Sequence, residues 1–447
     1  MQKNPAKLHA LLIGIIILVL VLFMLSIGLR LFTRAILVDR MGMNNAFTRL
    51  VLDDETKPHH ADLGEAITPP EQVSIPQSGL LGSIDNLKYV YISMTRQLIE
   101  KTNYFANQQL VFRRPIVEAA NGYDKFINWN LAGYSEYNNV IDMGEGYLTT
   151  FMNWVNIWDN VAAVAEFKQY LDSQGAPLLF VQIPNKISRK DTKFNNVVDF
   201  YNVNADELIG GLKDHGIRTL DLRDSAEEQQ IDYRSMFYNT DHHWRVEAGL
   251  WAAGQIGEEL NRGFGFDIDP AVFNPDNYAV ELFPSSFLGS LGKKVTLARA
   301  APDDFALLRP KFDVSLTLQI PAIGLDTTGG FDIIYDYAQL EIEDLYEREL
   351  YGMHLHSAAV QHGFIRMVNK LVKEGRPKVL MLGDSFNYVL TPYLALEFGQ
   401  LDLVDLRHYK PALRDLIETE GYDMVIIAYS SLFQVEYSSG FSMYDFR

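Results

Sequence analysis

Hydrophobic residues fall into two alternating kinds of segment over much of the chain after its first third. Short, continuous apolar runs are typical of strands buried on both faces of a parallel sheet. Longer segments between them carry apolar residues at helical spacing. The strand-like runs are residues 176–183, 218–222, 378–382, 401–406 and 423–428, and the helix-like segments are residues 153–171, 206–215, 246–260, 386–398 and 411–420. This alternation predicts an α/β fold with a doubly wound parallel sheet.

A longer apolar run lies near the N-terminus. Residues 11–29 carry no charge and are rich in Leu, Ile and Val, and at about 1.5 Å per residue they nearly span a hydrocarbon core of about 30 Å. We expect a transmembrane anchor rather than a cleavable signal peptide, because the run is long and no small-residue cleavage site follows it. Flanking charges do not decide its orientation. The plan of a signal anchor favours residues 1–10 as a cytoplasmic leader.

Two further segments depart from the alternating pattern. Residues 30–83 hold several prolines and little apolar periodicity, which is typical of a stalk or linker. Residues 262–345 combine short mixed segments with many Gly, Pro and Asp residues, and we interpret them as a smaller, β-rich insertion. Residues 84–261 and 346–447 are then the two parts of one α/β domain.

The composition excludes several classes of function. A formal net charge of −18 at pH 7 opposes binding to nucleic acid, because that affinity depends on clustered Lys and Arg. The chain has no cysteine, which excludes disulfides, thiolate metal sites and cysteine nucleophiles. Any covalent catalysis must therefore use another nucleophile.

The strongest candidate for chemistry is the sequence Gly383-Asp384-Ser385-Phe386, which lies directly between a predicted strand and a predicted helix. In open α/β folds, ligands bind at such turns, beyond the carboxyl ends of the strands. Gly383 permits a tight turn, and the N-terminus of the helix offers N–H groups to a developing oxyanion. The alternative is that Asp384 and Ser385 only cap the helix, since both residue types are favoured there.

A matching base is found in Asp241-His242-His243-Trp244, which precedes an apolar helix. A serine hydroxyl needs a neutral imidazole as base, and that imidazole needs a carboxylate to fix its tautomer. The alternative is a packing cluster at the N-terminus of the helix, with Asp241 as its cap.

A metal site is the second alternative for these residues. Asp241, His242 and His243 could combine with His354 and His356 into an Asp/His site. Adjacent histidines rarely point at one ion, and His354 and His356 have the spacing of alternating residues in a strand or loop. We therefore expect neither a metal nor another cofactor.

The order of these motifs resembles that of a known family. The N-terminal anchor and the motifs resemble the DHHW family, which is SGNH-hydrolase-like and related to the alginate O-acetylation proteins AlgX and AlgJ. The Asp-x-His-Trp element precedes the serine motif in that family, the reverse of ordinary SGNH hydrolases, and it does so here. The matching motifs are residues 184–186 (Pro-Asn-Lys), 240–244 (Thr-Asp-His-His-Trp), 289–293 (Gly-Ser-Leu-Gly-Lys) and 383–386 (Gly-Asp-Ser-Phe).

The resemblance implies an SGNH-like domain in which Ser385 takes up an acyl group, usually acetyl, and passes it to a glycan hydroxyl or to water. By the same resemblance, His243 is the base and Asp241 is the carboxylate that orients it. The chain departs from its relatives near the end of the last strand, where Ser430 stands in place of their Asn. Residues expected to contact the substrate or the oxyanion are Asn185, Lys186, Arg407, Tyr409 and Ser430.

From these observations we expect a membrane-anchored, extracytoplasmic serine O-acyltransferase or esterase that acts on acetyl groups of a cell-surface or exported polysaccharide. The resemblance implies a multispanning membrane acyltransferase of the MBOAT type as a partner. The alternative is a non-catalytic glycan-binding or assembly protein with the same fold, and a metal-dependent phosphoesterase is a third. Labelling by a fluorophosphonate would separate the first from the others.

Overall fold

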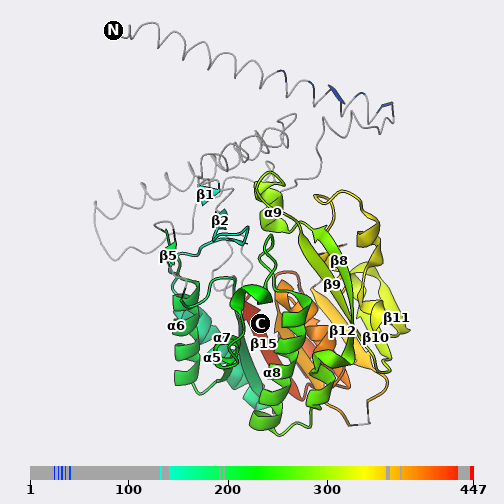
Figure 1. The fold of residues 1–447 in the computed structure, drawn as a ribbon. Helices are drawn as coiled ribbons and strands as arrows, with labels where there is room; N and C mark the ends of the chain where they lie inside the picture. Colours follow the sequence, from blue (N-terminus) through cyan, green and yellow to red (C-terminus); the bar gives the residue numbers. More distant parts are fainter. Residues whose placement is uncertain are drawn as a thin grey trace, which may run out of the picture. The chain divides into compact units, whose positions relative to one another are not determined.

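A computed structural model describes residues 140–447 except 191–192, 195–196, 359–362, 373–374 and 431–442, together with the backbone of residues 131–132 and seven residues between 25 and 41 (Figure 1). The chain divides into two units, Met1–Ala120 and Asn121–Arg447, and the fold below is that of the second. No helix among the described residues has the length and apolar character needed to cross a bilayer. The predicted anchor lies outside these residues except for Leu25 and Leu29.

The second unit is built on an eight-stranded sheet with the order β11-β10-β12-β14-β13-β15-β4-β7. The five strands from β14 to β7 pair in parallel, whereas β11, β10, β12 and β14 pair with one another antiparallel. The strands are β4 (Leu178–Ile183), β7 (Arg218–Asp221), β10 (Leu316–Ile320), β11 (Leu325–Gly329), β12 (Phe364–Asn369), β13 (Lys378–Gly383), β14 (Gln400–Val404) and β15 (Met424–Ser430).

The predicted α/β class is confirmed, but the predicted parallel sheet is parallel in only one part. The sheet is mixed because residues 316–329 and 364–369 add an antiparallel half to it. In β12 buried residues alternate with partly exposed ones, which is typical of antiparallel strands with one solvated face. Residues 262–345, expected as an insertion, are rich in strands as predicted, and β10 and β11 from this stretch belong to the central sheet.

Helices pack on both faces of the sheet, which makes it doubly wound as predicted. Alternate residues of the parallel strands point to opposite faces: Leu178 and Phe180 pack with α5 (Trp158–Gln174), α6 (Tyr201–Asp214) and α11 (Leu413–Glu420). Their neighbours Leu179 and Val181 belong to the larger core cluster, which includes α7 (Leu222–Glu228) and α8 (Val246–Phe264).

The helix predicted over residues 386–398 is shorter and interrupted. It consists of the 3-10 turn η9 (Ser385–Val389) and the short helix α10 (Thr391–Leu394). Pro392 lies at the start of α10, where its missing N–H and fixed φ favour a new helical start over continuation of the preceding turn.

The structure describes further elements besides the central sheet and the helices named above. They are β1 (Leu131–Ala132), β2 (Val140–Asp142), β3 (Leu148–Thr149), β5 (Lys193–Phe194), β6 (Val197–Val198), β8 (Tyr278–Phe287), α9 (Ser290–Val295), β9 (Asp303–Pro310) and the 3-10 turns η2 (Tyr233–Met236), η3 (Pro270–Phe273), η4 (Pro275–Asn277), η5 (Pro321–Ile323), η6 (Phe331–Ile334), η7 (Tyr337–Glu341) and η8 (Tyr351–Met353).

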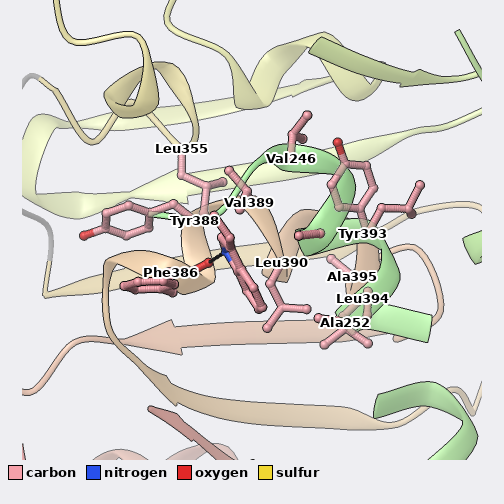
Figure 2. Packing of buried hydrophobic residues seen from close by; sticks show 14 of the residues in the cluster. Val246, Ala252, Leu355, Phe386, Tyr388, Val389, Leu390, Tyr393, Leu394 and Ala395 are labelled. Carbon is pink, nitrogen blue, oxygen red and sulfur yellow. Dashed lines mark hydrogen bonds between the residues drawn. The ribbon is translucent and has the colours of Figure 1, made fainter. Parts of the chain in front are cut away.

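Close packing of α8 against η9 joins the two parts of the α/β domain. Val246 and Ala252 of α8 lie in the same apolar cluster as Phe386 and Val389 of η9 (Figure 2). A Cβ atom added to Gly249 of α8 would overlap the backbone carbonyl of Val389. The glycine therefore allows the helix to touch the turn that follows the serine motif.

Replacing Gly249 with Ala should separate these two elements, because the backbone of Val389 cannot yield as a side chain would. We expect Gly249→Ala to destabilise the protein by about 1–3 kcal/mol, the usual cost of overpacking, seen as a lower midpoint of thermal unfolding. Gly210→Ala in α6 is the matched control, since no atom beyond its chain neighbours and its own helix backbone lies within 4 Å of its added Cβ. This substitution should stabilise the protein by about 0.5–1 kcal/mol. Equal effects of the two substitutions would contradict this account.

Candidate active site

Ser385 lies directly beyond the carboxyl end of β13, at the first position of η9. The capping interpretation is correct for its neighbour Asp384, whose carboxylate accepts from the N–H of Phe386 (2.9 Å) and from the N–H of Ser430 (2.7 Å). Burial raises the pKa of Asp384, while the hydrogen bond from Ser430 and the charge of Arg407 counteract that shift. Because Asp384 caps the turn, the Ser385 hydroxyl is left to form a different contact.

The hydroxyl of Ser385 meets the imidazole of His243. The distance from Ser385 Oγ to His243 Nε2 is 2.7 Å, across 142 positions of sequence. The other ring nitrogen, Nδ1, lies 2.6 Å from Asp241 Oδ1. Because an ionised carboxylate only accepts, Nδ1 carries the proton and Nε2 accepts from the serine hydroxyl. The structure thus brings together the three residues predicted to form a triad.

Asp241 is held from two sides. Its Oδ1 also accepts from the backbone N–H of His243 (2.9 Å), and its Oδ2 accepts from the N–H of Ser290 (2.6 Å). Burial alone would raise the pKa of Asp241, but the two neighbouring imidazoles and these hydrogen bonds hold it well below its usual value. A side chain at Gly289 would overlap Asp241, which explains why a glycine stands at this position of the motif.

The imidazole rings of His242 and His243 lie side by side but form different hydrogen bonds. The rings of the pair lie 3.8 Å apart, and His242 Nδ1 is 3.0 Å from the hydroxyl of Ser290. Asp241, His242 and His243 present donor atoms within 4.8 Å of one another, but both nitrogens of His243 already bind Asp241 and Ser385. His354 and His356, considered above as further ligands, contact Tyr335 and the carbonyl of Ile333 respectively.

Tyr351 forms a wall of the site that the sequence did not reveal. Its ring stacks on that of His243 with a centroid distance of 3.9 Å and an interplanar angle of 14°. Its hydroxyl donates to the backbone carbonyl of Ser385 at 3.0 Å. Tyr351 therefore touches both the proposed base and the backbone of the proposed nucleophile. No motif marks this residue, and a lone Tyr before a pair of histidines gives no recognisable signal.

Trp244, the last residue of the Asp-His-His-Trp motif, has a structural role. Its indole N–H donates to the carbonyl of Phe386 at 3.0 Å, and its ring packs edge-on against the Phe386 ring. This buried contact ties the residue after His243 to the residue after Ser385. The tryptophan thus helps to set the distance between the imidazole and the hydroxyl.

The other predicted site residues are placed in different ways. Asn185 is buried just after β4, and its Nδ2 finds no hydrogen-bond partner in the part of the chain that the structure describes. Lys186 donates to three backbone carbonyls of the loop before His243. Ser430 binds Asp384 through its N–H, and the guanidinium of Arg407 forms a bidentate pair with Asp405. Tyr409 packs against Phe364 instead of the triad.

The chain is similar to a known family model and to several solved structures. Residues 146–301 match the family model described as an SGNH hydrolase-like domain of the acetyltransferase AlgX. A DHHW family protein from Eubacterium siraeum is 15% identical, with a TM-score of 0.50 over 68% of this chain and 94% of that chain. The predicted resemblance is confirmed.

The fold is also similar to that of PatB1 from Bacillus cereus. That structure is 17% identical and has a TM-score of 0.55, over 69% of this chain and 99% of that chain. Its form with a sulfonyl adduct has a TM-score of 0.54 and 16% identity. At such identities the likeness concerns the fold alone. No curated protein matches the chain.

His354 makes the wall of the site sensitive to acid. It is buried among Phe305, Tyr335 and Tyr351, and burial lowers the pKa of His354 to about 3. An unfolded chain binds this proton below pH 6.5, whereas the folded chain does not, so stability is lost as the pH falls through that range.

We expect the wild type to lose about 2 kcal/mol more stability than His354→Phe between neutral pH and about pH 5. The measurement is the free energy of unfolding in urea as a function of pH. Burial and the neighbouring His243 lower the pKa of His242 to about 3 as well. His242 is present in both proteins, so its contribution to the pH dependence cancels in the comparison. Parallel pH curves for the two proteins would contradict the assignment to His354.

Proposed function

We propose that this protein is a serine O-acyltransferase or esterase of the SGNH type that acts on acetyl groups. The single observation that supports it most is the unbroken relay from Ser385 Oγ through the His243 ring to Asp241, with contacts of 2.7 and 2.6 Å. These are hydrogen-bond distances for a nucleophile, its base and the group that orients the base.

In the proposed reaction, Ser385 Oγ attacks the acyl carbonyl while His243 Nε2 accepts the hydroxyl proton. The bond from the carbonyl carbon to its leaving oxygen then breaks, and His243 returns the proton to that oxygen. An acyl-Ser385 intermediate remains. A sugar hydroxyl or water, deprotonated by His243 in turn, attacks the intermediate and restores the free serine. Throughout, the buried charge of Asp241 stabilises the imidazolium form of His243.

The developing oxyanion needs donors at the same edge of the sheet. We propose the Nδ2 group of Asn185 as one, because it is a buried donor without a partner among the described residues and lies beyond β4, two strands from β13. β14 and β15 flank β13; Ser430 is the last residue of β15, and Arg407 follows β14. We retain both, with Tyr409, as candidates for substrate contact. Loss of one oxyanion donor typically costs about a hundredfold to a thousandfold in rate.

We further propose that the acyl acceptor is a polysaccharide and that the chain is held at the membrane by residues 11–29, with its α/β domain outside the cell. The family description as an acetyltransferase and the long uncharged apolar run support this assignment. Since an exterior enzyme has no cytosolic acetyl donor at hand, a multispanning acyltransferase of the MBOAT type would supply the acetyl group.

The triad can be tested by covalent labelling and turnover. The wild type should react with a fluorophosphonate and hydrolyse p-nitrophenyl acetate. Ser385→Ala should abolish labelling, and both Ser385→Ala and His243→Ala should lower kcat by on the order of a thousandfold or more, because triad residues act as a unit. Ser173→Ala, at an exposed serine of α5, is the control. A folded wild type that is inert in both assays would instead favour a glycan-binding or assembly protein.

Tyr351 should contribute to the rate through His243 and Ser385, with little effect on KM. Tyr351→Phe keeps the stacked ring and loses one neutral hydrogen bond, so we expect kcat to fall about 2- to 10-fold. Tyr351→Leu also removes the aromatic face that favours the imidazolium, and kcat should fall further. Steady-state kinetics with p-nitrophenyl acetate measures both. Full kcat in Tyr351→Leu would exclude a positioning role.

A further inference from the structure

The loop that carries Asp241 lies between two buried, oppositely charged side chains. On one side, Lys186 Nζ donates to the backbone carbonyls of Tyr238 (2.5 Å), Asn239 (3.0 Å) and Asp241 (2.8 Å). Its ammonium also lies 4.2 Å from the centre of the Tyr147 ring. All three protons of the ammonium are therefore used within the protein.

Asp303, the first residue of β9, accepts hydrogen bonds from the donors of the same loop, whereas Lys186 donates to its carbonyls. Its Oδ1 accepts from the N–H of Asn239 (2.8 Å), and its Oδ2 accepts from both the N–H and the hydroxyl of Thr240 (2.7 Å each). Its side chain has no exposed surface. Together with Lys186, Asp303 satisfies most of the backbone groups just before the His243 motif.

A buried lysine costs several kcal/mol of desolvation unless it is well paired. Here its hydrogen bonds go to a segment that belongs to neither a helix nor a strand. Side chains on loops are held less accurately than side chains on regular elements, while Asp241 must stay within hydrogen-bond distance of His243. The charged pair compensates for the missing secondary structure.

We propose that Lys186 and Asp303 are positioning residues that clamp loop 238–241 and thereby hold Asp241 against His243. This role differs from the substrate contact expected of Lys186 from the sequence. The effect of the clamp on catalysis rests on the proposed function, but the clamp itself is a property of the folded chain.

The clamp should depend on pH. Burial lowers the pKa of Lys186 to about 7. The negative charges of Asp241 and Asp303 oppose this shift, and the positive charge of Arg245 adds to it. The guanidinium of Arg234 also contacts the Tyr147 ring, 5.1 Å from its centre. Below pH 7 the charged ammonium has three protons, one for each of the three carbonyls, so the clamp is complete. Above pH 7 the neutral amine has only two protons, so the clamp loosens as the pH rises.

Hydrogen exchange on the full chain, followed by mass spectrometry of its peptides, tests the clamp without requiring activity. In Lys186→Met, the amides of residues 237–245 should exchange at least about tenfold faster, equivalent to about 1.4 kcal/mol of lost protection, while peptides of α5 and β15 keep their rates. Asp303→Asn should have the same local effect, and the double variant should show less than the sum of the two, because both act on one loop. Lys168→Met, at an exposed ion pair, is the control.

Ester turnover then tests the consequence for catalysis. Lys186→Met should lower kcat with little change in KM. We expect kcat/KM of the wild type to decline above about pH 7, and this decline should be absent from the variant. Unchanged exchange in loop 238–241, or faster exchange in every peptide, would overturn the clamp. If the wild type fails to turn over esters, the proposed function fails, but the exchange result still decides whether Lys186 and Asp303 hold the loop.

Discussion

The hydrogen bond between Ser385 and His243 joins two segments that are 142 positions apart, and much of the structure around it serves to hold that distance. The serine is fixed by the end of β13 and by the Asp384 cap. The histidine is fixed by α8, which begins three positions after it. Contact between α8 and η9 at Gly249, and the hydrogen bond from Trp244 to the carbonyl of Phe386, connect the two supports. A shift of an ångström at either contact would separate base from nucleophile, since proton transfer requires hydrogen-bond distance.

Much of this arrangement could be predicted from the sequence. The parallel strands were visible as continuous apolar runs, and the triad was visible as two motifs because each places its key residues within a few positions. The antiparallel half of the sheet was harder to predict, since strands such as β12 have one solvated face and a weaker apolar pattern. Tyr351 and Asp303 could not have been found, because each reaches the site only through tertiary packing.

Lys186 illustrates the limit of residue-type reasoning. A lysine beside a proposed active site suggests contact with a charged substrate, and its motif supported that interpretation. In the folded chain its ammonium is turned inward to three carbonyls of loop 238–241. The decisive information is the geometry of the neighbouring backbone, which lies more than fifty positions away in sequence.

The mixed sheet has a consequence for how the site is assembled. Parallel strands deliver only their carboxyl ends to one edge of a sheet, and here they supply Ser385, Ser430 and Asn185. The antiparallel hairpin formed by β8 and β9 is not subject to that restriction. Its second strand begins where the first ends, so Asp303 at the start of β9 and Ser290 just after β8 both reach loop 238–241. The parallel half thus presents Ser385 and the candidate oxyanion donors, whereas residues 262–345 supply Ser290 and Asp303, which help to hold Asp241 and its loop. The candidate site therefore draws on both parts of the chain.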